Sequence, residues 1–261
     1  MERNPRSELN PGSDDFFLLS REMPSISEKC RLLEEAEITS CRPLYSGSNI
    51  VFLAELDNGD KKMRAVYKPR RGEAPLYDFP DGTLFKREYA AFLLSLALEW
   101  LMIPPTVIRS GPHGVGSVQW FVETGSRLDY FKALRSIHPD ELKQVALFDY
   151  VTNNADRKTG HCLPGADGRL WLVDHGLTFN AVPKLRTVIW DFAGQPVPGR
   201  LVKDVADLRR KLAPGAPLRE ALSSLLFKVE MEALENRIQR ILSRPVFPQP
   251  SSHRSFPWPD F

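Results

Sequence analysis

The spacing of hydrophobic residues divides this chain into two parts. From residue 36 to residue 68, short apolar runs are separated by turn residues, a pattern typical of β-strands. The expected strands lie at 37–45, 50–54 and 63–67. Asn58-Gly59, between the second and third run, predicts a tight two-residue hairpin.

One helix and two further strands are expected next. A helical pattern over 84–102 begins after Thr83, the expected N-cap, and ends before Pro104. Runs at 106–110 and 117–123, joined by a glycine-rich turn, predict two more strands. The first part should therefore form a small antiparallel sheet with one helix packed against it.

The second part is mostly helical. Apolar residues recur at helical spacing over four segments, and a short hairpin is expected at 162–173. The four segments are 139–151, 201–212, 217–226 and 229–242.

These patterns predict an α+β fold of two lobes. The β-rich first lobe would cover 26–123 and the α-rich second lobe 124–245. Residues 1–25 and 246–261 are rich in proline, and we expect a flexible leader and a loosely held tail there.

Composition narrows the class of protein. The 261 residues are 42% hydrophobic and 26% charged, which excludes a disordered chain, and a net charge of +2 gives no reason to expect nucleic acid as a partner. Three widely spaced cysteines exclude a disulfide scaffold or a zinc site of paired cysteines. The apolar stretch 90–103 is too short to span a bilayer, and no signal peptide is evident. We expect a cytoplasmic protein with no sequence sign of membrane contact.

Two aspartates are candidates for chemistry. Asp156 lies in the polar loop 153–161, and Asp174 follows the predicted hairpin, which would bring both to one end of it. Two carboxylates in one cleft suit metal-dependent phosphoryl transfer, where one accepts the proton of the acceptor hydroxyl and the other holds the metal. Taken singly, each aspartate is better explained as a turn cap.

The first lobe offers residues that would bind the phosphates. Lys68 ends a predicted strand, and Glu88 lies on the apolar face of the next helix, where a carboxylate is expected only if it is paired. Ser48 belongs to a short turn that could place backbone N–H groups over phosphates. Each residue also has a simpler explanation. Lys68 is then a solvated strand end, Glu88 a carboxylate favoured by the helix dipole, and Ser48 part of an ordinary hairpin turn.

The order of these motifs resembles a known family. AVYKP at 65–69, FDYVTNNADRKTGH at 148–161 and VDHGLTF at 173–179 resemble the phosphatidylinositol 3-/4-kinase-like branch of the protein-kinase fold. HipA-type kinases share the N-x-D-R loop. The segments 72–84, 87–91 and 185–192 are similar to an uncharacterised bacterial kinase-like family in that branch.

The resemblance implies a role for each position. Lys68 would bind the α- and β-phosphates of ATP, and Glu88 would hold Lys68. Asp156 would be the catalytic base, and Asp174 would bind Mg²⁺ or Mn²⁺. The backbone expected to hold the adenine ring comprises Phe121, Val122 and Glu123.

Two residues of the loop modify this picture. His161 stands where kinases usually have an asparagine that binds the second metal, and imidazole is a poor ligand for Mg²⁺. Three explanations of this histidine are open. A single metal ion is enough for the reaction, the site uses a softer ion such as Mn²⁺, or the protein binds nucleotide without turnover. Lys158 is placed to contact the transferred phosphate, with a solvent-facing lysine as the alternative.

The sequence thus predicts an ATP- and metal-dependent phosphotransferase. Its acceptor would be a hydroxyl of a lipid, a protein or a small molecule, and Lys184 and Arg186 either hold an acidic group of it or are simply solvated. A nucleotide-binding regulatory module without turnover is the second hypothesis. Nucleotidyl transfer to a protein hydroxyl is the third.

Overall fold

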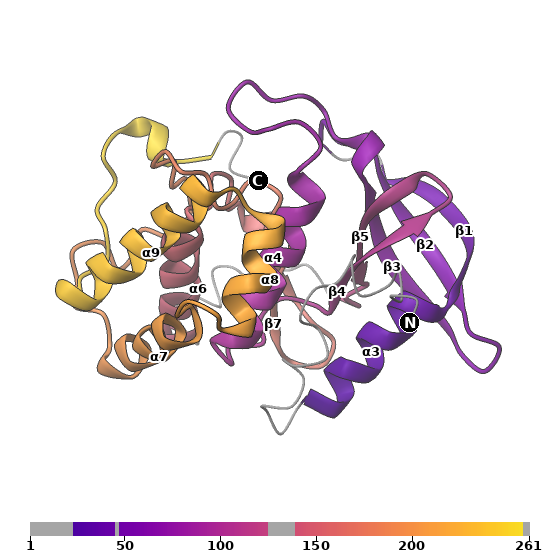
Figure 1. Cartoon of the computed structure of the whole chain (residues 1–261), viewed down its shortest axis with the longest axis horizontal. Coiled ribbons are helices and arrows are strands. Elements are labelled where there is room, and N and C mark those ends of the chain that lie inside the picture. The colour runs from indigo at the N-terminus through magenta and orange to yellow at the C-terminus, as the bar shows by residue number, and fades with distance from the viewer. Residues whose placement is uncertain (1–22, 45–46, 125–138, 258–261) are drawn as a thin grey trace.

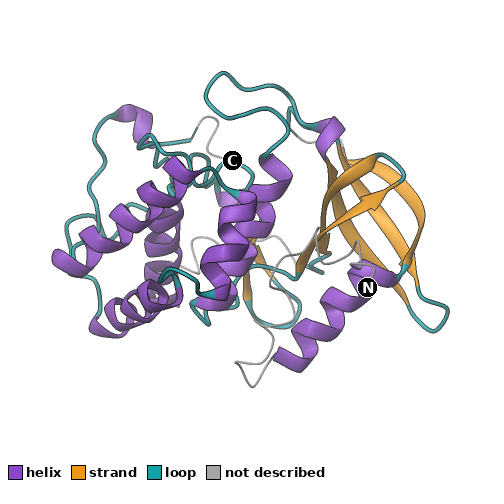
Figure 2. Ribbon diagram, in the orientation of Figure 1, coloured by secondary structure: helices purple, strands orange, loops and turns teal. Residues whose placement is uncertain are grey.

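The computed structural model describes residues 23–44, 47–124 and 139–257 (Figure 1). Most of the expected leader and the end of the expected tail lie outside these residues. The five-stranded sheet lies at one end of the molecule with a helix beside it, and most of the helices lie towards the other end (Figure 2). No helix in the described part of the chain is long and apolar enough to cross a membrane.

The first lobe is built on a five-stranded antiparallel sheet with the strand order β1-β2-β3-β5-β4. The strands are β1 (Glu37–Leu44), β2 (Val51–Asp57), β3 (Lys62–Pro69), β4 (Thr106–Gly111) and β5 (Gly114–Trp120). All five lie where the hydrophobic pattern predicted them, within a few residues. The last strand ends at Trp120, so residues 121–123 form the connection to the second lobe rather than strand.

A close approach of two backbones fixes the end of β3. Lys68 pairs with Ser117 across the sheet, and Pro69 pairs with Gly116. A Cβ atom at Gly116 would lie 2.3 Å from the Lys68 carbonyl oxygen, so only glycine fits there. This contact holds the strand end that carries the Lys68 side chain.

Two helices accompany the sheet, whereas the sequence predicted one. α3 (Met23–Glu35) packs on β4 and β5, and its last carbonyls are bound by Arg109, whose Nη1 donates to Leu33 O at 2.8 Å and Ala36 O at 2.7 Å. The prediction left this helix out, although its buried residues Ile26, Cys30 and Leu33 recur at helical spacing. It begins inside the segment expected to be a leader.

α4 (Leu84–Ala97) is shorter than the predicted 84–102. Glu99 and Leu101 adopt positive φ values of 58° and 46°, which end the helix before the prolines. Thr83 takes the predicted N-cap position, but its side chain makes no capping hydrogen bond. The Glu73 carboxylate instead accepts the N–H groups of Leu84 at 3.1 Å and Phe85 at 2.8 Å.

The second lobe contains four helices and a hairpin within the described residues. They are α6 (Pro139–Thr152), β6 (Cys162–Pro164), β7 (Leu170–Leu172), α7 (Gly199–Lys211), α8 (Pro217–Leu225) and α9 (Lys228–Ser243). All of them were expected, because each has a clear helical or strand-like spacing of apolar residues.

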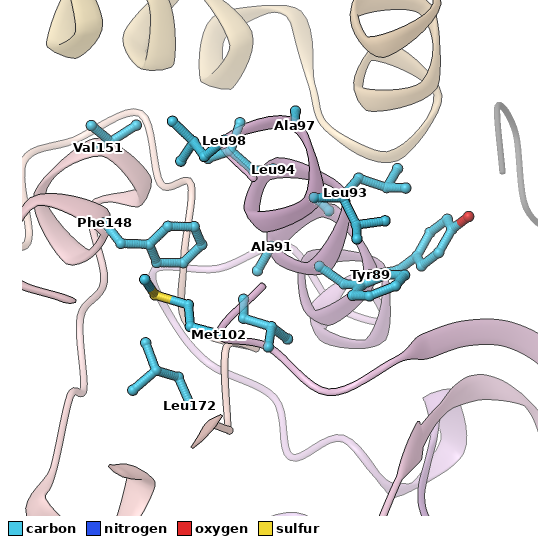
Figure 3. Packing of buried hydrophobic residues seen from close by; sticks show 14 of the residues in the cluster. Tyr89, Ala91, Leu93, Leu94, Ala97, Leu98, Met102, Phe148, Val151 and Leu172 are labelled. Atoms are coloured by element: carbon cyan, nitrogen blue, oxygen red, sulfur yellow. The ribbon is translucent and has the colours of Figure 1, made fainter. Parts of the chain in front are cut away.

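Helix α4 joins the two lobes, because it is buried almost all round. Leu94 of α4 and Leu98, which follows its last residue, pack near Phe148 and Val151 of α6 (Figure 3). On another side Arg87 forms a fully buried ion pair with Glu230 of α9, at 2.6 Å. The helix that carries Glu88 is therefore fixed against both lobes.

Candidate functional site

Three side chains from separate elements meet between the lobes. Lys68 from the end of β3 forms ion pairs with Glu88 of α4 and with Asp174 after β7, and the Lys68 Nζ to Asp174 Oδ1 distance is 2.9 Å. The second Glu88 oxygen accepts the backbone N–H of His175 at 3.0 Å. Burial disfavours the Lys68 ammonium, but the carboxylates of Asp174 and Glu88 outweigh it and hold its pKa above the usual value. Lys68 is thus a fixed cation.

Asp174 is held in an unusual backbone conformation. Its φ of 62° lies in the left-handed region, which aspartate tolerates better than most residues. Hydrogen bonds on both sides maintain it, from Val173 N–H to His161 O at 3.0 Å and from His175 N–H to Glu88. The Lys68 ammonium holds the pKa of Asp174 well below its usual range. Asp174 therefore carries an ionised, partly exposed carboxylate beside Lys68.

A buried ion pair anchors the loop that carries Asp156. The Arg157 guanidinium lies 3.0 Å from Asp149 Oδ1, and both side chains are 0% exposed. Arg157 also donates to the Val173 carbonyl at 3.1 Å and bonds His175 Nε2 at 2.7 Å. This arginine joins the loop to the strand that leads to Asp174.

Asp156 itself is partly exposed beside Lys158. The Lys158 Nζ to Asp156 Oδ2 distance is 3.3 Å. Burial raises the pKa of Asp156 despite the nearby ammonium. Its backbone N–H donates to Asn154 Oδ1 at 3.0 Å, which fixes the turn. A carboxylate with a raised pKa is a stronger base than an ordinary aspartate.

His161 faces the same carboxylate as Lys68 does. Its Nε2 lies 3.4 Å from Asp174 Oδ2, and burial lowers the pKa of its ring to about 4, so the ring is neutral near pH 7. The Lys158 backbone N–H donates to Nδ1 at 3.4 Å, which places the ring proton on Nε2. In this tautomer His161 directs a hydrogen-bond donor towards Asp174 rather than a lone pair that could bind a metal.

The donor set for a metal ion is correspondingly small. Within the described residues, no group of three or more histidine, cysteine, aspartate or glutamate side chains is placed to hold one. Mg²⁺ in nucleotide sites is commonly bound by one or two carboxylates together with phosphate oxygens and water. The Asp174 carboxylate fits this pattern as the protein ligand of such a metal, and the phosphates of the nucleotide would have to supply further ligands.

The remaining predicted residues lie at the edges of the site. Phe121, Val122 and Glu123 form the connection between the lobes, where Phe121 N–H donates to Arg64 O at 3.1 Å and Glu123 O accepts Ala166 N–H at 2.8 Å. Ser48 is exposed in the turn after β1, and no hydrogen bond joins its side chain to the other described candidates.

Sequence analysis did not assign roles to the residues that hold this site together. Asp149 and Arg157 lie inside the recognised loop motif, and their types and spacing of eight residues were the available signal. No local pattern indicated that Arg87 pairs with Glu230. Partners so far apart in the chain are set by packing.

Comparisons with known proteins identify one relative and a fold. No known family profile matches the chain. Protein Rv2133c of Mycobacterium tuberculosis is 40% identical over 264 aligned residues, covering 88% of this chain and 94% of that protein.

Three solved structures show the same architecture. Hydra Fam20 with sugar has a TM-score of 0.55 at 15% identity, covering 87% of this chain and 89% of that one. The Golgi casein kinase with Mn/ADP bound has a TM-score of 0.51 at 16% identity, with 86% and 75% covered. The Helicobacter pylori proinflammatory kinase CtkA has 0.51 at 11% identity, with 82% and 94% covered. The two-lobed kinase-like fold expected from the sequence is confirmed.

Proposed function

We propose that this chain, which belongs to the family of the mycobacterial Protein Rv2133c, is a metal-dependent kinase that transfers the γ-phosphoryl group of ATP to a hydroxyl. The observation that carries the proposal is the joint binding of Lys68 by Glu88 and Asp174. A cation fixed by two carboxylates from separate elements, with Asp156 nearby, is the arrangement that phosphoryl transfer requires.

The nucleotide would lie between the lobes. Lys68 would bind its α- and β-phosphates, and the turn with Ser48 would cover them. The adenine ring would meet the backbone of residues 121–123. Because Phe121 N–H and Glu123 C=O already have partners within the chain, we expect the ring to use the other backbone groups of this connection.

Asp174 would hold the metal, with phosphate oxygens and water completing its coordination. When bound, the metal supplies positive charge that neutralises the phosphates. The structure of the Golgi casein kinase neighbour with Mn/ADP supports the use of nucleotide and a divalent metal. His161 would donate its Nε2–H to a phosphate oxygen or to Asp174 rather than bind the metal.

Asp156 would act as the base. Its carboxylate accepts the proton of the acceptor hydroxyl as the hydroxyl oxygen bonds to the γ-phosphorus. The bond from the γ-phosphorus to the oxygen bridging to the β-phosphorus breaks at the same time, and ADP leaves. Lys158, which pairs with Asp156, would stabilise the transferred group.

One observation favours a second candidate. His161 offers a neutral donor where a second metal ligand is usual, which also suits a module that binds nucleotide without turnover. The more specific relation to phosphatidylinositol 3-/4-kinases and HipA-type kinases stays a prediction from the motifs.

A thermal-shift titration with ATP and Mg²⁺, Mn²⁺ or no metal separates these possibilities. A ligand at 100 times its Kd stabilises a protein by about 2.7 kcal/mol. We expect a metal-dependent shift in the wild type that Asp174→Ala abolishes and Asp156→Asn retains. ADP release in the presence of acceptors should be lost in both variants. Turnover absent from the wild type despite binding would indicate the regulatory module, and unchanged binding and turnover in both variants would refute the site.

A further inference from the structure

A cavity of about 580 Å³ lies on the second lobe, beside the loop that carries Asp156. Its walls come from the segment 181–190 that follows Asp174, from α9 and from the C-terminal segment 248–255, and Tyr77 reaches it from the loop before α4. Five cations and no carboxylate occur among its described lining residues. The cations are Lys184, Arg186, Arg237, Arg240 and Arg254.

Hydrogen bonds link this cavity directly to the catalytic loop. The Arg186 backbone N–H donates to Asn154 O at 2.9 Å, and the Arg157 N–H donates to Arg186 O at 3.0 Å. Asp156 lies between these two loop residues. The Arg186 side chain, which lines the cavity, also acts on the Asp156 carboxylate, because burial raises the pKa of Asp156 and the positive charge of Arg186 partly offsets this by favouring the ionised form. The cavity therefore lies next to the loop that carries the proposed base.

The positive charge of the cavity is mostly uncompensated. Lys184 pairs with Asp78 at 2.9 Å, but none of the four arginines forms an ion pair with a described carboxylate. Arg237 donates to Val151 O at 2.8 Å, while its Nη2 atom is buried without a partner in the described part of the chain. Burial lowers the pKa of Arg237 to about 10. Keeping the Arg237 guanidinium charged is therefore costly unless an anion binds it, whereas Arg240 and Arg254 are exposed and free of this cost.

The volume of the cavity and the kind of cation that lines it indicate which anion would bind there. A cavity of about 580 Å³ is within the range of small-molecule sites, roughly 300–1,000 Å³. One guanidinium can donate two parallel hydrogen bonds to two oxygens of the same phosphate group, which a lysine ammonium does not. The presence of four arginines against one lysine therefore favours a phosphate group. Tyr77 at the rim is 94% exposed, with Lys184 Nζ 5.9 Å from its ring centre, and offers a flat face to a bound molecule.

We propose that this cavity binds the acceptor, and that the acceptor is a small hydroxyl compound carrying a phosphate group. Arg237, Arg240 and Arg254 bind the phosphate, and a hydroxyl points to Asp156. The inference rests on the proposed kinase function. A free sugar phosphate and the head group of a phospholipid share this chemistry, and the product in either case carries one more phosphate.

The test measures binding by calorimetry, with Mn²⁺ and a non-hydrolysable ATP analogue saturating the nucleotide site. The probes are inorganic phosphate, glucose 6-phosphate, glucose, a glutamate-rich peptide, and phosphatidylcholine vesicles with or without phosphatidylglycerol. The variant is Arg240→Ala with Arg254→Ala. The matched control is Arg244→Ala, because Arg244 is exposed at the end of the same helix and does not line the cavity.

We expect the wild type and the control to bind phosphate and glucose 6-phosphate but not glucose. The double variant should bind them at least about tenfold more weakly, since each hydrogen bond to a charged group contributes about a factor of ten. The shift with the nucleotide should be unchanged in all variants. Binding only to phosphatidylglycerol vesicles, lost in the same variant, would identify the lipid source.

Several results would overturn the inference. They are no binding of any phosphate compound, equal binding by the double variant, an equal loss in Arg244→Ala, or binding of the glutamate-rich peptide in preference. Phosphate binding without any nucleotide shift would overturn the proposed kinase function and with it the acceptor role. Phosphate binding lost only with the cavity arginines, in a protein that binds nucleotide, would support both.

Discussion

Replacing Glu88 by glutamine should loosen the site without changing its shape. One Glu88 oxygen accepts from Lys68, and the other accepts the His175 N–H at 3.0 Å. Glutamine keeps one acceptor and replaces the other with an NH₂ group. Either Lys68 or the His175 N–H then faces a donor, and Lys68 loses one of its two negative partners.

The size of the effect follows from burial. Breaking a fully buried ion pair costs about 3–5 kcal/mol. The Glu88 side chain is 3% exposed, but that of Lys68 is 21% exposed and keeps Asp174 as a partner. We therefore expect Glu88→Gln to lower the free energy of unfolding by about 2–3 kcal/mol. ATP affinity should fall about tenfold or more, because Lys68 is no longer fixed.

Urea unfolding gives the stability, and the metal-dependent ATP shift gives the affinity. Glu99→Gln is the control, since Glu99 is 58% exposed and lies 3.4 Å from Lys211 at the surface. It should change stability by less than about 0.5 kcal/mol and leave ATP binding intact. If Glu88→Gln also changed stability by less than about 0.5 kcal/mol and kept its ATP shift, the assigned role of the pair would be wrong.

Four further results are expected. Glu230→Gln should cost about 3–5 kcal/mol in urea unfolding, because it leaves the Arg87 cation buried without its carboxylate; a cost below about 1 kcal/mol would contradict this. Phosphoryl transfer should fall in acid through a pKa above the usual aspartate range, because burial raises the pKa of Asp156 and the base must be ionised; a rate independent of pH would argue against that base. The folded state then binds the Asp156 proton more readily than the unfolded chain does, so ionisation of Asp156 lowers the free energy of unfolding as the pH rises. Asp156→Asn should therefore have a higher melting temperature than the wild type at pH 8 but not near pH 4. Iodoacetamide at pH 8 should modify Cys41 before Cys162, whose pKa burial raises to about 12, and mass spectrometry showing the reverse order would mean that the hairpin opens.

Much of the fold follows from local pattern. The strands of the sheet and the helices after Asp174 lie where apolar spacing and turn residues predict them, because each buries one face and that face repeats with the period of the element. Helix α3 was not predicted, although Ile26, Cys30 and Leu33 mark its buried face at helical spacing. At the start of α4, Thr83 takes the predicted N-cap position, but the side-chain hydrogen bonds come from Glu73, eleven residues earlier, which no local pattern indicated.

The candidate site divides in the same way. Lys68, Asp156 and Asp174 were recognisable from motifs, because they lie at the ends of predictable strands and loops. Which of them touch, and the tautomer of His161, depended on contacts across the lobes. The structure brings Lys68 and Asp174 together over 106 positions of sequence.

The amino-acid sequence by itself determined the order of elements, the kinase-like class and the residues available for chemistry. Tertiary structure alone decided that Arg87 meets Glu230, that Arg157 meets Asp149, and that arginines from distant segments share one cavity. The physical reason is the distance along the chain over which each effect acts. Propensity and periodicity act over a few residues, whereas a buried charge takes its partner from whichever segment packing brings to it.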